Sequence, residues 1–216
     1  QFAWLFDSEF DSVNLNSDVM GFDLGNILSD MNCKTPALMY LIYRVQQAMA
    51  GQKGIIFFDE GWLALNDAIF ADIFNDLART PRKKNIIFGL ATQVANDTVD
   101  SSINKAINES AHCKIFFPNA SADRSIYVDN FGLTEHEYQL VKSLPDDQHY
   151  FLLIHGHGSN KESVVARPDL SGMHEDIAII SGRESSLALL DKIRAEVGND
   201  PADWISVFKS NVRSLT

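Results

Sequence analysis

Three continuous apolar runs most constrain how this chain can fold. They lie at residues 55–58, Asn85–Ala91 and Cys113–Phe117, and stretches with helical spacing separate them. A strand that is apolar throughout is buried on both faces, which is typical of a parallel sheet covered by helices. The pattern therefore predicts an α/β domain with a mostly parallel sheet flanked by helices.

The segments around these runs predict further elements of the domain. Gly21-Phe-Asp-Leu indicates a short strand at about 18–24. Thr35-Pro36 predicts a helix start, with Thr35 as the N-cap and Pro36 at the first helical position, and the helix should continue to about Ala50. The side chains expected on its buried face are Leu38, Leu41, Ile42, Val45 and Met49.

Two more helices are expected in the first half of the chain. One follows Trp62, with apolar residues recurring at Leu65, Ile69, Ile73 and Leu77. The other covers about residues 97–110 and leads into the third apolar run.

The pattern changes after Pro118. Thr134 and Glu137 form a capping box for a short helix, and Tyr150–Ile154 with Ser163–Arg167 predict a hairpin. Three signals follow: a strand at Ile177–Ile180, a capping box of Ser181 and Glu184 before a helix, and a final helix from Asp200-Pro201. We expect residues 1–216 to form one domain, in which 131–216 add strands and helices to a core formed by 1–130.

The composition limits the classes of function. The net charge is −11, which argues against the basic surface that nucleic-acid binding by counterion release requires. Two separated cysteines indicate neither a disulfide framework nor a cysteine metal site. No apolar run approaches the ~20 residues that span a bilayer. The chain opens on Gln1 without a Met, so we expect it to be part of a longer protein.

Two acids, Asp59 and Glu60, directly follow the first apolar run. A buried carboxylate is unfavourable unless a cation, a proton or a strong hydrogen bond compensates it. P-loop NTPases use this arrangement: the Asp holds Mg²⁺ through water, and the Glu polarises the water that attacks the γ-phosphate. The alternative is that both acids begin the next helix, where negative charge suits the helix dipole.

The second apolar run ends in Ala91-Thr92-Gln93. If the first two strands are neighbours, Gln93 lies at the same sheet edge as Glu60, where ligands of open α/β sheets bind. A neutral amide there can contact the γ-phosphate or the attacking water. The alternative is a polar strand end that caps the helix from Asn96.

Several blocks of the chain together resemble a known family. GIIFFDEGW, RTPRKKNIIFGLATQ, KIFFPN, FGLTEHEY and IISGRE occur in this order. The chain resembles, over nearly its whole length, the C-terminal ATPase domain of the VirB/TrbE/CagE component-four ATPases of type IV secretion systems. These ATPases are related to conjugative coupling proteins and to the FtsK/HerA translocases. The resemblance implies a RecA-like P-loop NTPase core.

The resemblance also implies roles for individual residues. Asp59 matches the magnesium-linked Asp of the Walker B motif, Glu60 the catalytic Glu, and Gln93 the sensor at the end of the next strand, with Thr92 beside the nucleotide. The basic cluster of Arg79, Arg82, Lys83 and Lys84 matches the region of an arginine finger. Arg82 fits that position best, Arg79 is second and Arg124 a distant third. The alternative for this cluster is a solvated helix end.

The implied parent protein uses ATP and Mg²⁺ at the boundaries between subunits of a homo-oligomer, a hexamer by resemblance. It is cytoplasmic and peripheral at the bacterial inner membrane, and it powers pilus biogenesis and translocation of protein or DNA. The implied partners are inner-membrane channel proteins, the second secretion ATPase and pilin; direct nucleic-acid binding by this chain is not expected. Two alternatives stay open: a DNA-translocating ATPase of the FtsK/HerA or coupling type, and a non-catalytic docking scaffold.

One departure from the family pattern concerns the phosphate-binding loop. None of the 12 glycines is followed by Lys, so the Walker A motif is missing. We therefore expect the chain alone neither to bind ATP well nor to hydrolyse it. His155-Gly-His-Gly lacks a third metal ligand nearby and predicts a hairpin loop, and the acids of FDSEFD, at 6–11, do not match a calcium loop.

Overall fold

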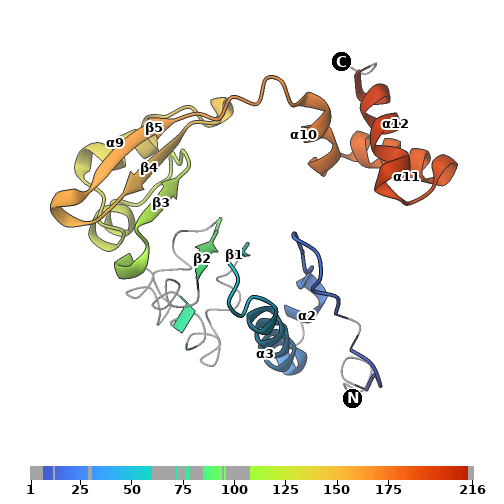
Figure 1. Cartoon of the computed structure of the whole chain (residues 1–216). Helices are drawn as coiled ribbons and strands as arrows, with labels where there is room; N and C mark the ends of the chain where they lie inside the picture. The colour runs from blue at the N-terminus through green and yellow to red at the C-terminus, as the bar shows by residue number, and fades with distance from the viewer. Residues whose placement is uncertain are drawn as a thin grey trace. The chain divides into compact units, whose positions relative to one another are not determined.

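A computed structural model describes residues 7–11, 13–28, 31–59, 72, 76, 77, 85–93, 95 and 108–213 (Figure 1). The chain divides into two compact units, residues 1–166 and 167–216. Both helices and strands are present in the first unit, and helices form the second. The fold is therefore of the mixed α/β kind.

The first two apolar runs form parallel strands, as predicted, and the structure shows that the two are neighbours. β1 (Gly54–Phe58) pairs with β2 (Ile86–Leu90), and the register runs from Gly54 opposite Ile86 to Phe58 opposite Leu90. The rings of Phe58 and Phe88 lie 5.8 Å apart between centroids. Gly89 lies opposite Phe57, and a Cβ there would approach the Phe57 ring to 2.5 Å.

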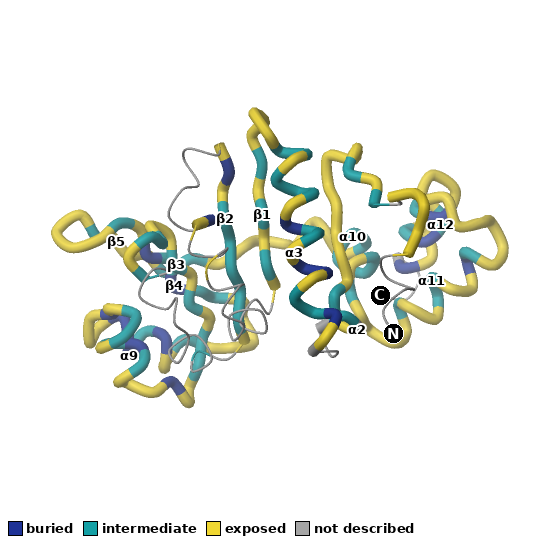
Figure 2. Tube along the Cα trace, turned by 90° about the horizontal axis from the view of Figure 1, so that it is seen from below, coloured by how far each residue is buried: buried dark blue, intermediate teal, exposed yellow. Residues whose placement is uncertain are grey.

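The expectation that these strands are buried on both faces is wrong for this structure. Successive residues of a strand point to opposite faces of its sheet. On β1 the exposed and half-buried positions alternate, and Ile55, Phe57 and Ile87 are exposed (Figure 2). One face of the β1–β2 pair is therefore open to solvent.

A long helix precedes β1. The short helix α2 (Gly25–Leu28) packs against α3 (Met31–Ala48), which buries Cys33, Ala37, Leu38 and Ile42. The predicted start at Thr35 is wrong, because α3 begins at Met31 and continues through Pro36. Pro36 therefore lies inside α3, where a proline lacks the N–H for one i→i−4 hydrogen bond and its ring crowds the carbonyl four residues earlier. The strand expected at about 18–24 is not formed.

A three-stranded antiparallel sheet follows. It has the order β3 (Cys113–Phe116), β4 (Phe151–His155) and β5 (Glu162–Ala166), with Cys113 opposite His155 and His155 opposite Glu162. The predicted hairpin is confirmed. β3 was expected to extend the parallel sheet, but it pairs antiparallel with β4, so the described strands form two sheets rather than one. The η3 turn (Gly158–Asn160) lies in the hairpin loop, where Gly156 has a positive φ and a Cβ would lie 2.3 Å from the Asn160 carbonyl oxygen.

Helices cover one face of this sheet (Figure 1). They are the π-helix η1 (Ser125–Asn130) and α9 (Glu135–Ser143), followed by the 3₁₀ turn η2 (Asp146–Gln148). The capping box is confirmed, because Glu137 N donates to Thr134 Oγ1 and Thr134 N donates to Glu137 Oε2. The buried residues of this core are Ala122, Tyr127, Leu133, Tyr138, Val141, Leu152 and Ile154.

A buried ion pair joins α9 to the start of β5. Lys161 Nζ donates to Glu137 Oε2 at 2.5 Å and to the Gly132 carbonyl oxygen at 2.9 Å. Burial acts to raise the pKa of Glu137, but the hydrogen bonds from Lys161 and Thr134 outweigh it and hold that pKa below its usual value. The carboxylate therefore stays charged in the folded protein because Lys161 is there.

The second unit consists of α10 (His174–Ile180), α11 (Glu184–Val197) and α12 (Pro201–Arg213). The strand predicted at Ile177–Ile180 is wrong, because these residues belong to α10. A short apolar run does not distinguish a strand from a helix by itself, and here Ala178 and Ile179 pack on the helical core. Ser181 does not cap α11, whose N-cap is Arg183.

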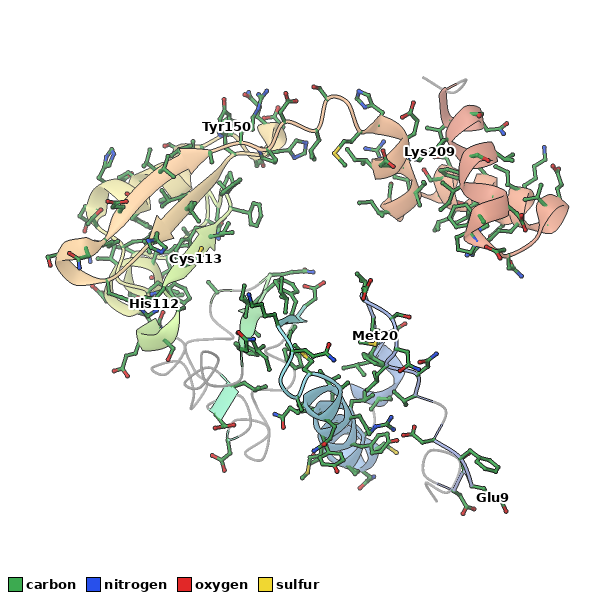
Figure 3. All side chains as sticks on the ribbon, viewed as in Figure 1. Glu9, Met20, His112, Cys113, Tyr150 and Lys209 are labelled. Carbon is green, nitrogen blue, oxygen red and sulfur yellow. The ribbon has the colours of Figure 1, made fainter. Side chains whose placement is uncertain are left out.

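The predicted start of α12 at Asp200-Pro201 is confirmed, and Asp200 Oδ1 accepts a hydrogen bond from Ala202 N at 2.9 Å. The core of this unit consists of Ile193, Trp204, Phe208 and Val212. Lys209, labelled in Figure 3, forms an ion pair with Asp176 at 2.5 Å and so joins α12 to α10. Among the described helices, none is both long and apolar enough to cross a membrane.

Replacing Lys161 with Met should destabilise α9 by about 3 kcal/mol, because it leaves the Glu137 carboxylate buried without its partner. Glu137→Gln should have a smaller effect, since Gln retains the capping geometry. Hydrogen exchange of the α9 amides measures both effects, with Lys53→Met at an exposed lysine as the control. Equal exchange in Lys161→Met and Lys53→Met would contradict the stabilising role.

The sign of the pH dependence follows from the lowered pKa of Glu137. Its stabilisation is fully present above the unfolded-state pKa of about 4.3, and it is lost as the pH falls through the lower folded-state pKa. The difference in stability between the wild-type chain and Glu137→Gln should therefore shrink over that acidic range.

Phe208→Ala should destabilise the second unit by about 3–5 kcal/mol, because Phe208 is fully buried between its helices. The measurement is urea unfolding followed by the fluorescence of Trp204, whose ring lies 6.4 Å from that of Phe208. Val197→Ala, at a partly exposed position, is the control. The exchange rate of the Val141 amide, in the first unit, should not change. If that amide also exchanged faster in Phe208→Ala, the two units would unfold together.

Candidate functional site

The carboxyl ends of β1 and β2 lie at one edge of the parallel pair. Phe58 is opposite Leu90, and Ala91 N donates to the Phe58 carbonyl oxygen at 2.8 Å. Asp59 directly follows β1, and Thr92 and Gln93 follow β2 after one further residue. The parallel register therefore brings these three residues to the same edge of the sheet.

The side chains at this edge are accessible to solvent. Asp59 and Gln93 are exposed and Thr92 is half-buried. The expectation that Asp59 is buried is wrong for this structure, because the pair of strands opens directly to solvent at its edge. A carboxylate, a hydroxyl and an amide are all oxygen donors, which are the ligands that Mg²⁺ prefers.

Other predicted site residues cannot be placed. Glu60, Arg79 and Arg82 lie outside the described residues, as does most of the helix expected after Trp62. From that stretch the structure describes Asp72, Asp76 and Leu77, all helical, with Leu77 fully buried. The structure thus brings Asp59, Thr92 and Gln93 to one edge, and the roles of all these residues stay predictions.

The edge fits one part of a magnesium–nucleotide site. Asp59 offers a single carboxylate, which suits contact to Mg²⁺ through water rather than a metal cage made only of protein groups. Within the described part of the chain, no three His, Cys, Asp or Glu side chains are arranged to hold a metal ion. A cradle for phosphates would have to come from elsewhere, since no glycine of the sequence precedes a lysine.

Arg124 has partners within its own chain. Its Nε donates to Glu135 Oε1 at 2.6 Å, its guanidinium forms an ion pair with the same carboxylate, and Asp129 lies 3.8 Å away. These carboxylates, Glu135 foremost, raise the pKa of Arg124. The guanidinium is therefore engaged locally, which makes Arg124 less suited than a free arginine to reach a nucleotide.

The histidine-rich loop between β4 and β5 lies next to His112, the residue just before β3. The His157 ring meets the His112 ring edge-on at 4.8 Å between centroids. Burial and the neighbouring His112 and Lys114 lower the pKa of His157. His112 and Cys113 are labelled in Figure 3. The loop therefore contacts the antiparallel sheet, and its residues are far from Asp59 in the sequence.

Sequence reasoning missed an open groove beside β1. Residues 13–25, the α3 helix and all of β1 line it, together with Asp59 at one end. The strand signal at 18–24 was the only indication that this segment lies near β1. The groove is analysed below.

The chain is similar to three named proteins. It is 37% identical over 207 residues to the type IV secretion system protein VirB4 of Bartonella henselae, which covers 95% of this chain and 26% of that protein. It is 32% identical over 209 residues to VirB4 of Brucella abortus, at 96% of this chain and 25% of that protein. It is 35% identical over 207 residues to the type IV secretion system protein PtlC of Bordetella pertussis. That match covers 95% of this chain and 25% of PtlC. No protein-family model matches the chain.

The names of these relatives indicate the class of protein to which the chain is similar, because each is a type IV secretion system protein. Within this class, the chain belongs to the family of VirB4 and PtlC proteins, and the resemblance inferred from its motifs is confirmed. It spans about a quarter of the length of the curated relatives it matches.

Proposed function

We propose that this chain is part of the ATPase motor of a bacterial type IV secretion system. The observation that carries the proposal is the register of β1 and β2, which places Asp59 and Gln93 at one sheet edge. Family membership supports it, since the relatives are secretion-system proteins. The acidic net charge of −11 favours this function over DNA translocation by this part of the protein.

Each residue at the edge has a distinct role in the proposed site. Bound Mg²⁺ would neutralise charge on the phosphates of ATP. Asp59 would hold the water shell of that ion, Glu60 would accept a proton from the attacking water, and Gln93 would orient this water from the neighbouring strand, with Thr92 beside the nucleotide. Arg82, or else Arg79, stabilises negative charge at the γ-phosphate of a neighbouring subunit.

The proposed architecture extends beyond the described residues. Residues 1–216 belong to one RecA-like domain, whose phosphate-binding loop is supplied by residues outside this sequence. The active form is a homo-oligomer, a hexamer by family resemblance, at the cytoplasmic face of the inner membrane. It works with channel proteins, the second secretion ATPase and pilin in pilus biogenesis and substrate transfer.

Glu60→Gln in the longer protein should abolish phosphate release, by at least about a hundredfold, and preserve nucleotide binding, because the amide cannot accept the proton of water. Phosphate release and binding of a fluorescent ATP analogue measure the two effects. Glu162→Gln, at an exposed position on β5, is the matched control and should retain activity. If the unsubstituted protein releases no phosphate, the chain is a docking scaffold instead. The 216-residue chain alone should not gain thermal stability with millimolar ATP.

An arginine finger that acts between subunits predicts complementation. Protomers with Arg82→Ala keep their own catalytic Glu, and protomers with Glu60→Gln keep their finger. Mixing the two inactive proteins should therefore restore a fraction of the ATPase rate, because some boundaries then contain both groups. Arg124→Ala is the control and should be active without mixing. If mixing restores no activity with Arg82→Ala but does so with Arg79→Ala, the finger is Arg79; if it does so with neither, the finger lies elsewhere.

A further inference from the structure

One wall of the groove is the edge of β1 that does not face β2. β1 pairs with β2 on one side, and its whole length lines the groove on the other. The hydrogen bonds define the direction of each amide: Gly54 N donates to the Asn85 carbonyl oxygen, and the Phe58 carbonyl oxygen accepts from Ala91 N. Because amides alternate along a strand, Ile55 and Phe57 direct their N–H groups away from β2 and toward the groove.

The opposite wall is a segment without helix or strand, residues 13–24, which we call the strap. It is tethered at both ends. At its start, Arg44 of α3 forms an ion pair with Asp11 and donates from Nη2 to the Val13 carbonyl oxygen. At its end, the strap continues into α2, which packs on α3. Apart from the bond from Arg44, its hydrogen bonds within the described residues are local turns, such as Asn16 N to Asn14 Oδ1 and Gly25 N to Asp23 Oδ1.

Apolar side chains line both walls and stay exposed. On the strap, Val19 is 87% exposed, and Met20, labelled in Figure 3, and Phe22 are also exposed. On β1, Ile55 is 69% and Phe57 64% exposed. The α3 side chains between the walls include Leu38 and Ile42. Bringing such side chains into contact removes apolar surface from water, which is favourable.

The chain order defines how the strap can fit against β1. Strap, helix and β1 follow each other along the chain as in a β-α-β unit, whose two strands are parallel because the helix crosses over between them. β1 and β2 already form a parallel pair. A strand formed by the strap would therefore run parallel to β1 and would end near Asp59.

We propose that the strap closes over the groove and adds to the free edge of β1 as a third, parallel strand. Closure places Met20 and Phe22, which share one face of such a strand, beside Ile55 and Phe57, and it satisfies the amides of the free edge. It also brings Asp23 to the sheet edge that holds Asp59, Thr92 and Gln93. The open form described above and this closed form differ only in the strap, whose tethers through Arg44 and α2 are kept.

Amide hydrogen exchange of the 216-residue chain, followed residue by residue by NMR, tests the closure. In the open form, only the amides of β1 that face β2, such as those of Ile56 and Phe58, have ladder partners. In the closed form, the amides of Ile55 and Phe57 should exchange as slowly as these neighbours. Rapid exchange at Ile55 and Phe57 beside slow exchange at Ile56 and Phe58 would overturn the proposal.

Phe22→Asp places a charge in the apolar groove and should speed exchange at Ile55 and Phe57 at least about tenfold, with Ile56 and Phe58 unchanged. Asn16→Asp adds the same charge at an exposed position of the strap and should leave all four amides unchanged. Protection that rises with protein concentration would assign the edge to a second copy of the chain and overturn the closure. If Phe22→Asp unfolds the sheet, the wild-type exchange pattern still decides.

Discussion

The parallel hydrogen bonds between β1 and β2 are the constraint on which the candidate site depends. Residues 59 and 93 are separated by a stretch that includes an expected helix, and only the pairing of Phe58 with Leu90 brings them to one edge. A slip by one residue would turn every side chain of the strand to the other face. The chemistry proposed for Asp59, Glu60 and Gln93 therefore rests on backbone geometry rather than on direct contacts among their side chains.

The antiparallel sheet is organised differently, by a buried polar network. Glu137 caps α9 and pairs with Lys161, while Lys114 of β3 donates to the Phe131 carbonyl oxygen at 3.1 Å. Burial and the nearby Lys161 lower the pKa of Lys114, so two lysines share a limited space beside consecutive carbonyl groups, those of Phe131 and Gly132. These contacts hold the turn after η1 against the sheet. They stabilise this part of the chain and take no part in the proposed site.

Local patterns predicted local structure well. The capping box of α9, the hairpin of β4 and β5 and the start of α12 were correct because each depends on residues close together in sequence. The run at Ile177–Ile180 was wrong because its few apolar residues suit a strand and a helix equally, and packing against α11 and α12 decides between them. For the site, the sequence indicated which residues meet at an edge but not that Asp59 would be exposed.

The sequence by itself determined the family, the apolar strands and the polar residues that end them, since these follow from residue types at short spacing. Only the tertiary structure decided which strands pair, that β3 joins an antiparallel sheet, and that Lys161 reaches Glu137 across 24 positions. Such pairings depend on the free energy of bringing distant segments together. Residue spacing in the sequence does not reveal this free energy. The burial and the hydrogen bonds that offset the loss of chain entropy form only when the distant segments are in contact.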